Sequence, residues 1–253
     1  RIVVGADDEQ AYKIVEKMYA PLELPIVHVS VRSSEMIKYA SNDFLALKIS
    51  YINEIANFCE IVGADIEEVA RGMGMDRRIG SNFLKAGIGY GGSCFPKDTK
   101  ALNFQSDHAG VKLKTVKATI DVNREQRTKL IDKARRFFPD FRGVRVAIIG
   151  LTFKPGTDDL REAPAKKNID ILLNEGADII AWDPLGAENF RKCYPNCAIN
   201  FADDIDEALT DAAVCFIMTE WEKIVEYPLD NYKKYMKRPL VFDGRNCYKL
   251  SEV

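Results

Sequence analysis

Residues 144–150 have the sequence VRVAIIG, a nearly unbroken apolar run that ends in glycine. A short apolar run closed by a turn residue is typical of a strand that is buried on both faces of a sheet. Strands of that type occur in parallel sheets, where the crossover connections place helices on both faces. The run therefore predicts that an α/β domain begins close to this point of the chain.

The sequence beyond this run alternates between helix and strand patterns. Such βαβ alternation is typical of a Rossmann-like, doubly wound parallel sheet. We place the domain boundary near Arg142, which gives a sheet domain over residues 142–253. The elements expected after the first strand are a helix at 163–174, strands at 177–182, 198–201, 213–219 and 240–243, and helices at 206–209 and 230–236.

Residues 1–141 predict a helical domain built around one long helix. No Pro or Gly interrupts the helical pattern over residues 35–62, and Ser33 or Ser34 can cap its start. A helix of roughly 28 residues exceeds the usual range for a globular domain. Such a helix spans between parts of a protein or pairs with a second copy, so we expect residues 35–62 to form the axis of a homodimer.

Shorter elements are expected around the long helix, together with a glycine-rich loop at residues 76–96. The complete fold expected is α/β: a central long-helix dimerisation domain, followed by the Rossmann-like doubly wound parallel sheet domain. The other elements expected before Arg142 are a helix at 7–19, a strand at 26–31, a short helix capped by Asp65, a helix that starts at Pro96 and one continuous helix over 115–138.

Composition and charge exclude several classes of protein. Among the 253 residues, 36 Lys and Arg face 38 Asp and Glu, so the formal net charge is −2. This balance argues against a nucleic-acid partner, since such proteins carry a marked basic excess. No apolar run approaches the roughly 18 residues of a membrane span, so no membrane partner is expected. The six cysteines are scattered in a chain without a secretory signal, which favours the reducing cytoplasm over a disulfide framework.

A glycine-rich motif, GIGYGGSCFPKD at residues 87–98, gives the strongest indication of chemistry. Glycines let the backbone adopt positive φ angles and approach a ligand closely. Cys94 precedes the helix expected at Pro96, where the helix dipole and Lys97 both favour the thiolate form. The motif thus predicts a nucleophilic cysteine, although a glycine-rich turn with a buried structural cysteine fits the spacing equally well.

A polar pair on the long helix, Lys38 and Asn42, is spaced i, i+4 and so shares one helix face. The two side chains could jointly hold an oxyanion or a water molecule. A solvated surface pair would show the same spacing, so this pattern alone assigns no role.

The loop after the first strand of the sheet domain lies where parallel sheets bind ligands, outside the carboxyl ends of the strands. It contains Lys154 and Arg161, which could meet phosphate groups, although the loop has no GxGxxG fingerprint. Arg245 follows the last expected strand and could join the same crevice. Ordinary solvated loop cations are an equally good interpretation.

No metal site is expected. Cys193 and Cys197 have a CxxxC spacing but no second pair of ligands nearby. His28 and His108 have no partners in the sequence, so neither predicts a catalytic triad.

Short motifs occur along the whole chain in a fixed order. They are EMIKYASN at 35–42, RIG at 78–80, FLK at 83–85, GGSCFPKD at 91–98, FK at 153–154, RE at 161–162 and DGRN at 243–246. In this order they closely resemble the UDP-glucose/GDP-mannose dehydrogenase family, over essentially all 253 residues. The resemblance implies an NAD-dependent enzyme that carries out a two-step, four-electron oxidation of a nucleotide sugar.

The resemblance also implies catalytic roles. Cys94 would attack the C6 aldehyde, giving a thiohemiacetal and then a thioester that is hydrolysed to the carboxylate. Lys38 and Asn42 would stabilise negative charge on the C6 oxygen, and Asp98 would assist water or proton transfer. The implied substrate is UDP-glucose, oxidised to UDP-glucuronate. The alternatives are another nucleotide sugar, UDP-N-acetylmannosamine or GDP-mannose, or a non-catalytic nucleotide-sugar-binding or dimerisation module.

Binding residues follow from the same resemblance. Arg78 would reach the substrate of the neighbouring subunit, in line with a homodimer. Lys97 and Arg161 would lie towards NAD. The residues implied to bind the nucleotide sugar are Phe83, Leu84, Lys85, Tyr90, Gly91, Lys154 and Arg245.

Family members begin with an NAD-binding Rossmann domain that carries a GxGxxG motif, followed by catalytic Thr and Glu residues. No such domain is found at the start of this chain, which begins at Arg1. We therefore expect the chain to correspond to the central and C-terminal domains of a longer enzyme. It would lack the N-terminal domain that mainly binds NAD, and would be inactive alone.

Overall fold

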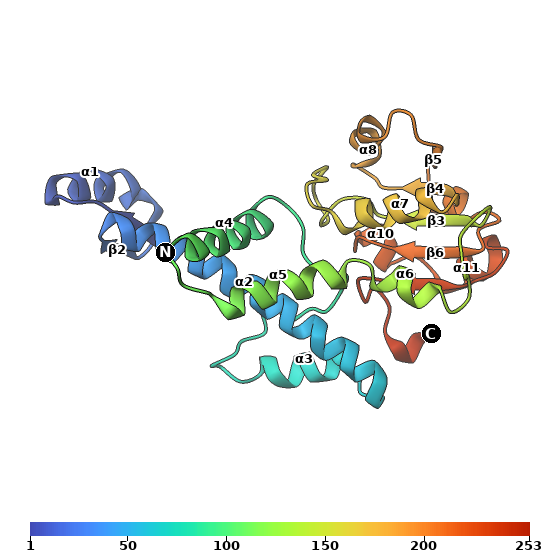
Figure 1. Ribbon diagram of the computed structural model, residues 1–253, viewed down its shortest axis with the longest axis horizontal. Helices are drawn as coiled ribbons and strands as arrows, with labels where there is room; N and C mark the ends of the chain where they lie inside the picture. The colour runs from blue at the N-terminus through green and yellow to red at the C-terminus, as the bar shows by residue number, and fades with distance from the viewer.

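A helix of 32 residues, α2 (Val31–Val62), is the longest element and the axis of the first half of the chain (Figure 1). The computed structural model describes all residues from 1 to 253. Ser30 caps α2, since its Oγ accepts a hydrogen bond from the backbone N–H of Ser33 at 3.2 Å. The expected caps at Ser33 or Ser34 are therefore wrong, because the extended backbone of Ser30 provides the acceptor and lets the helix begin earlier.

Shorter elements surround α2. They are β1 (Ile2–Gly5), α1 (Glu9–Tyr19), a 3-10 turn (Ala20–Leu22), β2 (Ile26–Val29), α3 (Ile66–Gly74), α4 (Cys94–His108) and α5 (Lys114–Gln126). Helices α4 and α5 pack along α2, and α3 lies near its C-terminal end (Figure 1). Strands β1 and β2 pair in parallel as a separate two-stranded sheet. Neither these helices nor any other helix of the chain combines the length and the apolar character that crossing a membrane requires.

The single helix expected over residues 115–138 is wrong, because α5 ends and a separate helix, α6 (Lys129–Ala134), follows after a break. At the break, Asn168 donates a hydrogen bond from Nδ2 to the carbonyl oxygen of Arg127 at 2.7 Å. That carbonyl would otherwise accept a bond inside the helix. A contact from a distant part of the chain therefore accompanies the end of α5, which local sequence could not show.

The second half of the chain forms one five-stranded sheet with helices on both faces (Figure 1). Its elements are β3 (Arg145–Ile149), α7 (Pro164–Asn174), β4 (Asp178–Trp182), α8 (Ala187–Cys193), β5 (Ile199–Phe201), α9 (Ile205–Leu209), β6 (Val214–Ile217), α10 (Glu222–Val225), α11 (Leu229–Tyr235), β7 (Val241–Asp243) and a 3-10 turn (Leu250–Glu252). The strand order is β5-β4-β3-β6-β7 and all neighbours are parallel. This order confirms the predicted α/β fold with a Rossmann-like doubly wound sheet. Helices α8 and α10 were not predicted from the sequence.

Strand β3 is buried on both sides of this sheet. Val146 and Ile148 belong to one core, together with side chains of α6, α7 and α8. Ala147 and Ile149 belong to the other core, with side chains of α9, α10 and α11. All four residues are fully buried, which explains why this strand has an unbroken apolar sequence.

Helix α6 belongs with the sheet by its packing. Leu130 and Ile131 are buried in the same core as Val146 of β3. Helix α6 precedes the boundary that we propose near Arg142 but packs against the sheet. The segment that connects the two halves is therefore partly a helix buried in the core of the sheet domain.

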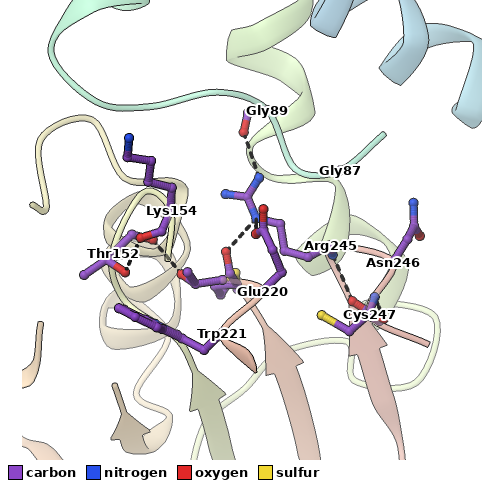
Figure 2. A network of polar contacts seen from close by, with 12 residues as sticks. Gly87, Gly89, Thr152, Lys154, Glu220, Trp221, Arg245, Asn246 and Cys247 are labelled. Carbon is purple, nitrogen blue, oxygen red and sulfur yellow. Dashed lines mark hydrogen bonds and ion pairs between the residues drawn. The ribbon is translucent and has the colours of Figure 1, made fainter. Parts of the chain in front are cut away.

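The crevice of the sheet lies at the carboxyl ends of β3 and β6. Strand order reverses between these two neighbours, and such a reversal opens a crevice for ligands in doubly wound sheets. The loops that follow β3, β6 and β7 meet there, and they contain Lys154, Glu220 and Arg245 respectively (Figure 2). The fold therefore brings three charged side chains to one edge of the sheet.

Candidate functional site

Cys94 is the first residue of α4, and its thiol is exposed. The alternative of a buried structural cysteine is therefore wrong. The helix also begins two residues before the expected start at Pro96, which is accommodated in the first turn because the missing N–H has no helical partner there. The thiol lies at the positive end of a 15-residue helix. Lys97 and Arg161 are close enough to Cys94 for their charges to interact with it.

The carboxylate of Asp98, one helical turn after Cys94, accepts hydrogen bonds from side chains of two helices. Asn42 Nδ2 and Lys38 Nζ, both on α2, donate to its Oδ2 at 2.6 and 3.2 Å, and Lys97 Nζ lies 2.8 Å from its Oδ1. Only 4% of the Asp98 side chain is exposed. Burial alone would raise the pKa of Asp98, but the three donors outweigh burial and hold that pKa below its ordinary value. The polar pair of α2 is thus not merely a solvated surface pair.

A second carboxyl group, Asp43, lies beside Asp98 and has no counterpart among the predicted site residues. It is 7% exposed, and neither of its carboxyl oxygens has a hydrogen-bond partner. Burial, and to a smaller extent the charge of Asp98, raise the pKa of Asp43 from 3.8 to about 6. No motif indicates this residue; only its place next to Asn42 brings it into the site.

A cavity of about 320 Å³ is lined by residues from both halves of the chain. Phe95, the residue after Cys94, forms part of its wall and contacts the rings of Phe83 and Tyr90 edge-on at centroid distances of 6.0 and 5.8 Å. Of the residues implied to bind a nucleotide sugar, those that line the cavity are Phe83, Lys85, Tyr90, Gly91, Lys154 and Arg245. Three of these are cationic, so the cavity suits an anionic ligand next to the cysteine.

Other predicted binding residues lie outside this cavity. The side chain of Leu84 is buried against Ile52 and Ala86, so its expected place in the pocket wall is wrong. Arg78 is 89% exposed and pairs with Asp76. It lines neither this cavity nor the larger hollow between α2, α3 and the C-terminal residues, and its role at a neighbouring subunit stays a prediction.

The two residues assigned towards NAD are solvent-facing cations near Cys94. Arg161 pairs with Asp159 at 2.7 Å and is 68% exposed. Lys97 pairs with Asp98 and is 70% exposed. Both lie beside the thiol rather than inside the cavity.

Arg245 lies at the centre of a buried polar network (Figure 2). Its Nε donates to the carbonyl of Met218 at 2.8 Å, and its Nη1 donates to the carbonyl of Gly89 at 3.3 Å. The carboxylate of Glu220 lies 3.3 Å from Nε, while Nη2 is buried without a partner. Burial lowers the pKa of Arg245, and Glu220 opposes that effect. A buried guanidinium nitrogen without an acceptor favours a ligand oxygen at this place.

Glu220 is a cavity residue that the sequence prediction missed. It directly follows the strand expected at 213–219, at the carboxyl end of β6. The rule that selected Lys154, a position after a parallel strand, would have selected Glu220 as well.

Asp183, which follows β4, is not free to bind the ribose of a dinucleotide. In dinucleotide-binding Rossmann domains an acidic side chain about 20 residues after the glycine-rich turn accepts a bond from that ribose. Asp183, at the carboxyl end of β4, is 5% exposed and already accepts bonds from its own chain. Its donors are the backbone N–H groups of Leu151, Thr152, Leu185 and Gly186, the hydroxyl of Thr152 and the indole N–H of Trp221.

A larger hollow of about 1200 Å³ lies between α2, α3 and the C-terminal residues. It shares Lys85 and Ala86 with the smaller cavity. Cys94 and Asp98 line neither space, but Phe95, the residue after Cys94, lines the smaller cavity and not the larger hollow, so the smaller cavity lies nearer to the cysteine loop.

The fold and the site together define an α/β protein with a cavity that three cationic side chains line at the crevice of a parallel sheet, near an exposed cysteine. Comparison with family models agrees. The central domain of the UDP-glucose/GDP-mannose dehydrogenase family matches residues 32–125, and the UDP binding domain of the same family matches residues 147–250. The chain therefore belongs to the UDP-glucose/GDP-mannose dehydrogenase family.

Individual relatives resemble the chain over its whole length. UDP-glucose 6-dehydrogenase YwqF of Bacillus subtilis is 48% identical over 253 residues, which are 100% of this chain and 57% of the relative. The UDP-glucose 6-dehydrogenase of Rhizobium meliloti is 45% identical over 262 residues, covering 100% and 59%. The structure of a UDP-glucose dehydrogenase from Pyrobaculum islandicum has a TM-score of 0.92 at 33% identity, over 99% of this chain and 56% of that one. The chain thus spans little more than half the length of these relatives.

Proposed function

We propose that the chain is the cysteine-bearing and nucleotide-sugar-binding part of a UDP-glucose 6-dehydrogenase, which oxidises the C6 alcohol of UDP-glucose to a carboxylate with NAD. The observation that carries the proposal is the convergence of Lys38, Asn42 and Asp98 one turn from Cys94. This cluster lies beside a cavity with three cationic side chains. Relatives at 48% and 45% identity that are named UDP-glucose 6-dehydrogenase support the choice of substrate.

Cys94 is the proposed nucleophile and acyl carrier. Its thiolate adds to the C6 aldehyde and forms a thiohemiacetal, whose oxidation leaves a thioester. Water then attacks the thioester carbon, which releases the carboxylate and returns the thiolate. Bound NAD supplies the acceptor for the hydride that each of the two oxidations removes. Cys94 lies at the N-terminal end of α4, with the cations Lys97 and Arg161 near its thiol.

The Lys38, Asn42 and Asp98 cluster is proposed to handle charge and protons at C6. Lys38 Nζ and Asn42 Nδ2 are donors on one helix face, and they can stabilise the oxyanion of the thiohemiacetal and of the hydrolytic intermediate. Asp98 is held ionised by its donors, so it can accept the proton of the attacking water.

Nucleotide binding is assigned to the cavity of about 320 Å³. Lys154 and Arg245 are proposed to hold the diphosphate, and Phe83 and Lys85 the base. The unpartnered Nη2 of Arg245 supports this role, because it has no acceptor inside the chain.

NAD is proposed to contact Lys97 and Arg161 while being held mainly by a part of the relatives that this chain does not span. The occupied oxygens of Asp183 are consistent with this arrangement, since that residue is not free to accept a bond from a dinucleotide ribose. The isolated chain would then bind the nucleotide sugar without turning it over. Oxidation of UDP-glucose by this chain with NAD at a normal rate would contradict this arrangement.

The exposed apolar side chains of α2 support a homodimer through this helix. Phe44, Tyr51 and Phe58 are spaced by seven residues, so they share one helix face, and they are 61%, 48% and 59% exposed. A continuous exposed apolar stripe indicates a protein interface. Arg78 would then reach the site of the second subunit.

Calorimetric titration of the chain with UDP-glucose and with GDP-mannose tests the substrate assignment. We expect UDP-glucose to bind at least about tenfold more tightly. Tighter binding of GDP-mannose would replace UDP-glucose as the substrate, and absence of binding to both would refute the proposed function.

Alkylation by iodoacetamide at neutral pH, read by mass spectrometry, tests the role of Cys94. Cys94 should react faster than Cys193 and Cys197, which are also exposed and serve as controls within the same molecule. Equal rates at the three exposed thiols would contradict an activated thiolate. The buried Cys59 and Cys215 should remain unlabelled.

A further inference from the structure

The wall of the cavity between Gly87 and Tyr90 has no regular secondary structure of its own. Side-chain amides take the place of a strand partner. Asn123 Oδ1 accepts the backbone N–H of Tyr90 at 2.8 Å, and Asn123 Nδ2 donates to the Tyr90 carbonyl at 3.2 Å. Gln126 Nε2, one turn further along α5, donates to the Gly87 carbonyl at 2.7 Å. Asn53 of α2 accepts the Gly87 N–H at 2.7 Å.

Gly89, which lies between Gly87 and Tyr90, leaves room for the side-chain amide of Asn123. Gly89 has a φ of +89°, and a Cβ at this position would lie only 2.6 Å from Asn123 Oδ1. Any other residue would therefore push the segment away from the side chain that holds it. Asn123 itself is 5% exposed and lines neither of the two cavities. Its polar atoms are consequently directed at this backbone and not at a ligand.

The next residue after α5 extends the same contact to the sheet domain. Arg127 Nη2 donates to the Tyr90 carbonyl at 3.1 Å, and Arg127 Nη1 donates to Glu162 at 2.8 Å. Glu162 belongs to the loop after β3, which also carries Lys154. The end of α5 thus contacts both walls of the cavity.

We propose that Asn123 and Gln126 are positioning residues that hold the segment from Gly87 to Tyr90 in its ligand-binding conformation. The inference rests on the proposed function, since it concerns the same cavity. An irregular segment with few contacts of its own would otherwise sample many conformations, and the ordering cost would weaken binding. The buried amide groups of the two residues supply that order before the ligand arrives.

The test compares Asn123→Ala, Asn123→Asp and the control Asn189→Ala in the full chain. Asn189 also makes a side-chain hydrogen bond, to Asp158, and neither of these residues lines the cavity. Asn123→Asp keeps the acceptor for the Tyr90 N–H and loses the donor. The readouts are amide hydrogen exchange at Tyr90 and the dissociation constant for UDP-glucose.

We expect Asn123→Ala to speed exchange at Tyr90 and to weaken UDP-glucose binding by about tenfold or more. Asn123→Asp should fall between wild type and Asn123→Ala, and Asn189→Ala should match wild type in both readouts. Unchanged far-UV circular dichroism, which reports on α5 and the helices around it, together with unchanged tryptophan fluorescence from the sheet domain, would show that both halves of the variants fold.

Two results would overturn the inference. Unchanged exchange at Tyr90 in Asn123→Ala would show that the amide does not hold the segment. Faster exchange with unchanged affinity would show that its order is irrelevant to binding. Failure of the wild-type chain to bind UDP-glucose would instead refute the proposed function, and the exchange measurement would still decide whether Asn123 orders the segment.

Discussion

The substitution Asp43→Asn should stabilise the folded chain at neutral pH. Asp43 is 7% exposed, and neither of its carboxyl oxygens has a hydrogen-bond partner. The titratable groups that interact with it from neighbouring segments are Asp98 of α4 and Tyr90. An ionised carboxylate without donors costs free energy in such a place, because burial removes its hydration. Asparagine has nearly the same shape without the charge, so the substitution removes this cost without opening a cavity.

The magnitude follows from the proton affinity of Asp43 in the folded chain. Its pKa rises from 3.8 to about 6 on folding. At about 1.4 kcal/mol for each pH unit, the upper limit is about 3 kcal/mol. Relaxation and solvent screening around the charge reduce the effect, so we expect about 1–2 kcal/mol. As the pH rises from about 4 to about 6, the unfolded chain releases this proton while the folded chain keeps it, and wild-type stability falls relative to the variant.

Urea unfolding at about pH 4 and about pH 7.5 measures this difference. Far-UV circular dichroism reports on α2 and the helices packed on it. Trp182 and Trp221 are the two tryptophans of the chain and both lie in the sheet half, so their fluorescence is an internal control that should not change. Asp107→Asn, at an exposed carboxyl of α4, is the matched control variant. A variant no more stable than wild type at pH 7.5, or equally stabilised at both pH values, would refute the reasoning.

Three further substitutions test the junction, the cavity and the dimer. Gly91→Ala places a Cβ 2.4 Å from the carbonyl oxygen of Glu162, so urea unfolding should show a loss of about 1–3 kcal/mol; a smaller loss would mean that the backbone contact is not rigid. Arg245→Met leaves Glu220 without its counter-charge, and UDP-glucose affinity measured by calorimetry should fall by about 100-fold; a change within threefold would remove Arg245 from the site. Phe58→Asp puts a charge on the exposed stripe of α2, so sedimentation should change from dimer to monomer, and a wild-type monomer at micromolar concentration would exclude this interface.

The strands of the sheet could be predicted from the sequence because a buried strand depends on the residue types of a short, continuous segment. A strand covered on both faces needs apolar side chains at consecutive positions, and Val146 to Ile149 satisfy it. Helix boundaries failed where a side chain elsewhere decides them. Ser30 caps α2, although Ser33 and Ser34 fit the capping pattern as well. Asn168 bonds to the carbonyl of Arg127, which lies 41 residues earlier in the sequence. Neither contact leaves a periodic signal.

In the site, too, features set by neighbouring residues could be predicted from the sequence, and contacts between distant residues could not. The i, i+4 spacing predicted that Lys38 and Asn42 share one helix face. Their shared partner Asp98 lies 56 residues after Asn42, so only the family resemblance could link these three residues to one site. A family resemblance assigns a role to every residue of a matching motif. Leu84 was therefore assigned to the ligand pocket together with Phe83 and Lys85, although its side chain packs against Ile52 and Ala86 instead. Asp43 was missed because nothing in a sequence distinguishes a buried carboxyl on a helix from a solvated one.

The junction between the two halves decides how far the reactive thiol lies from the cations of the sheet domain. The backbone N–H of Gly92 donates to the carbonyl of Arg161 at 2.8 Å, and a Cβ on Gly92 would lie 2.8 Å from the ring of Phe153. Glycine therefore lets the cysteine loop lie directly against the loop that carries Lys154. Because both contacts involve backbone or a partly buried ring, the two ends of the site cannot drift apart as flexible side chains would. If Lys154 holds one end of the nucleotide sugar as we propose, these contacts would keep Cys94 close to the other end, as the proposed attack on C6 requires.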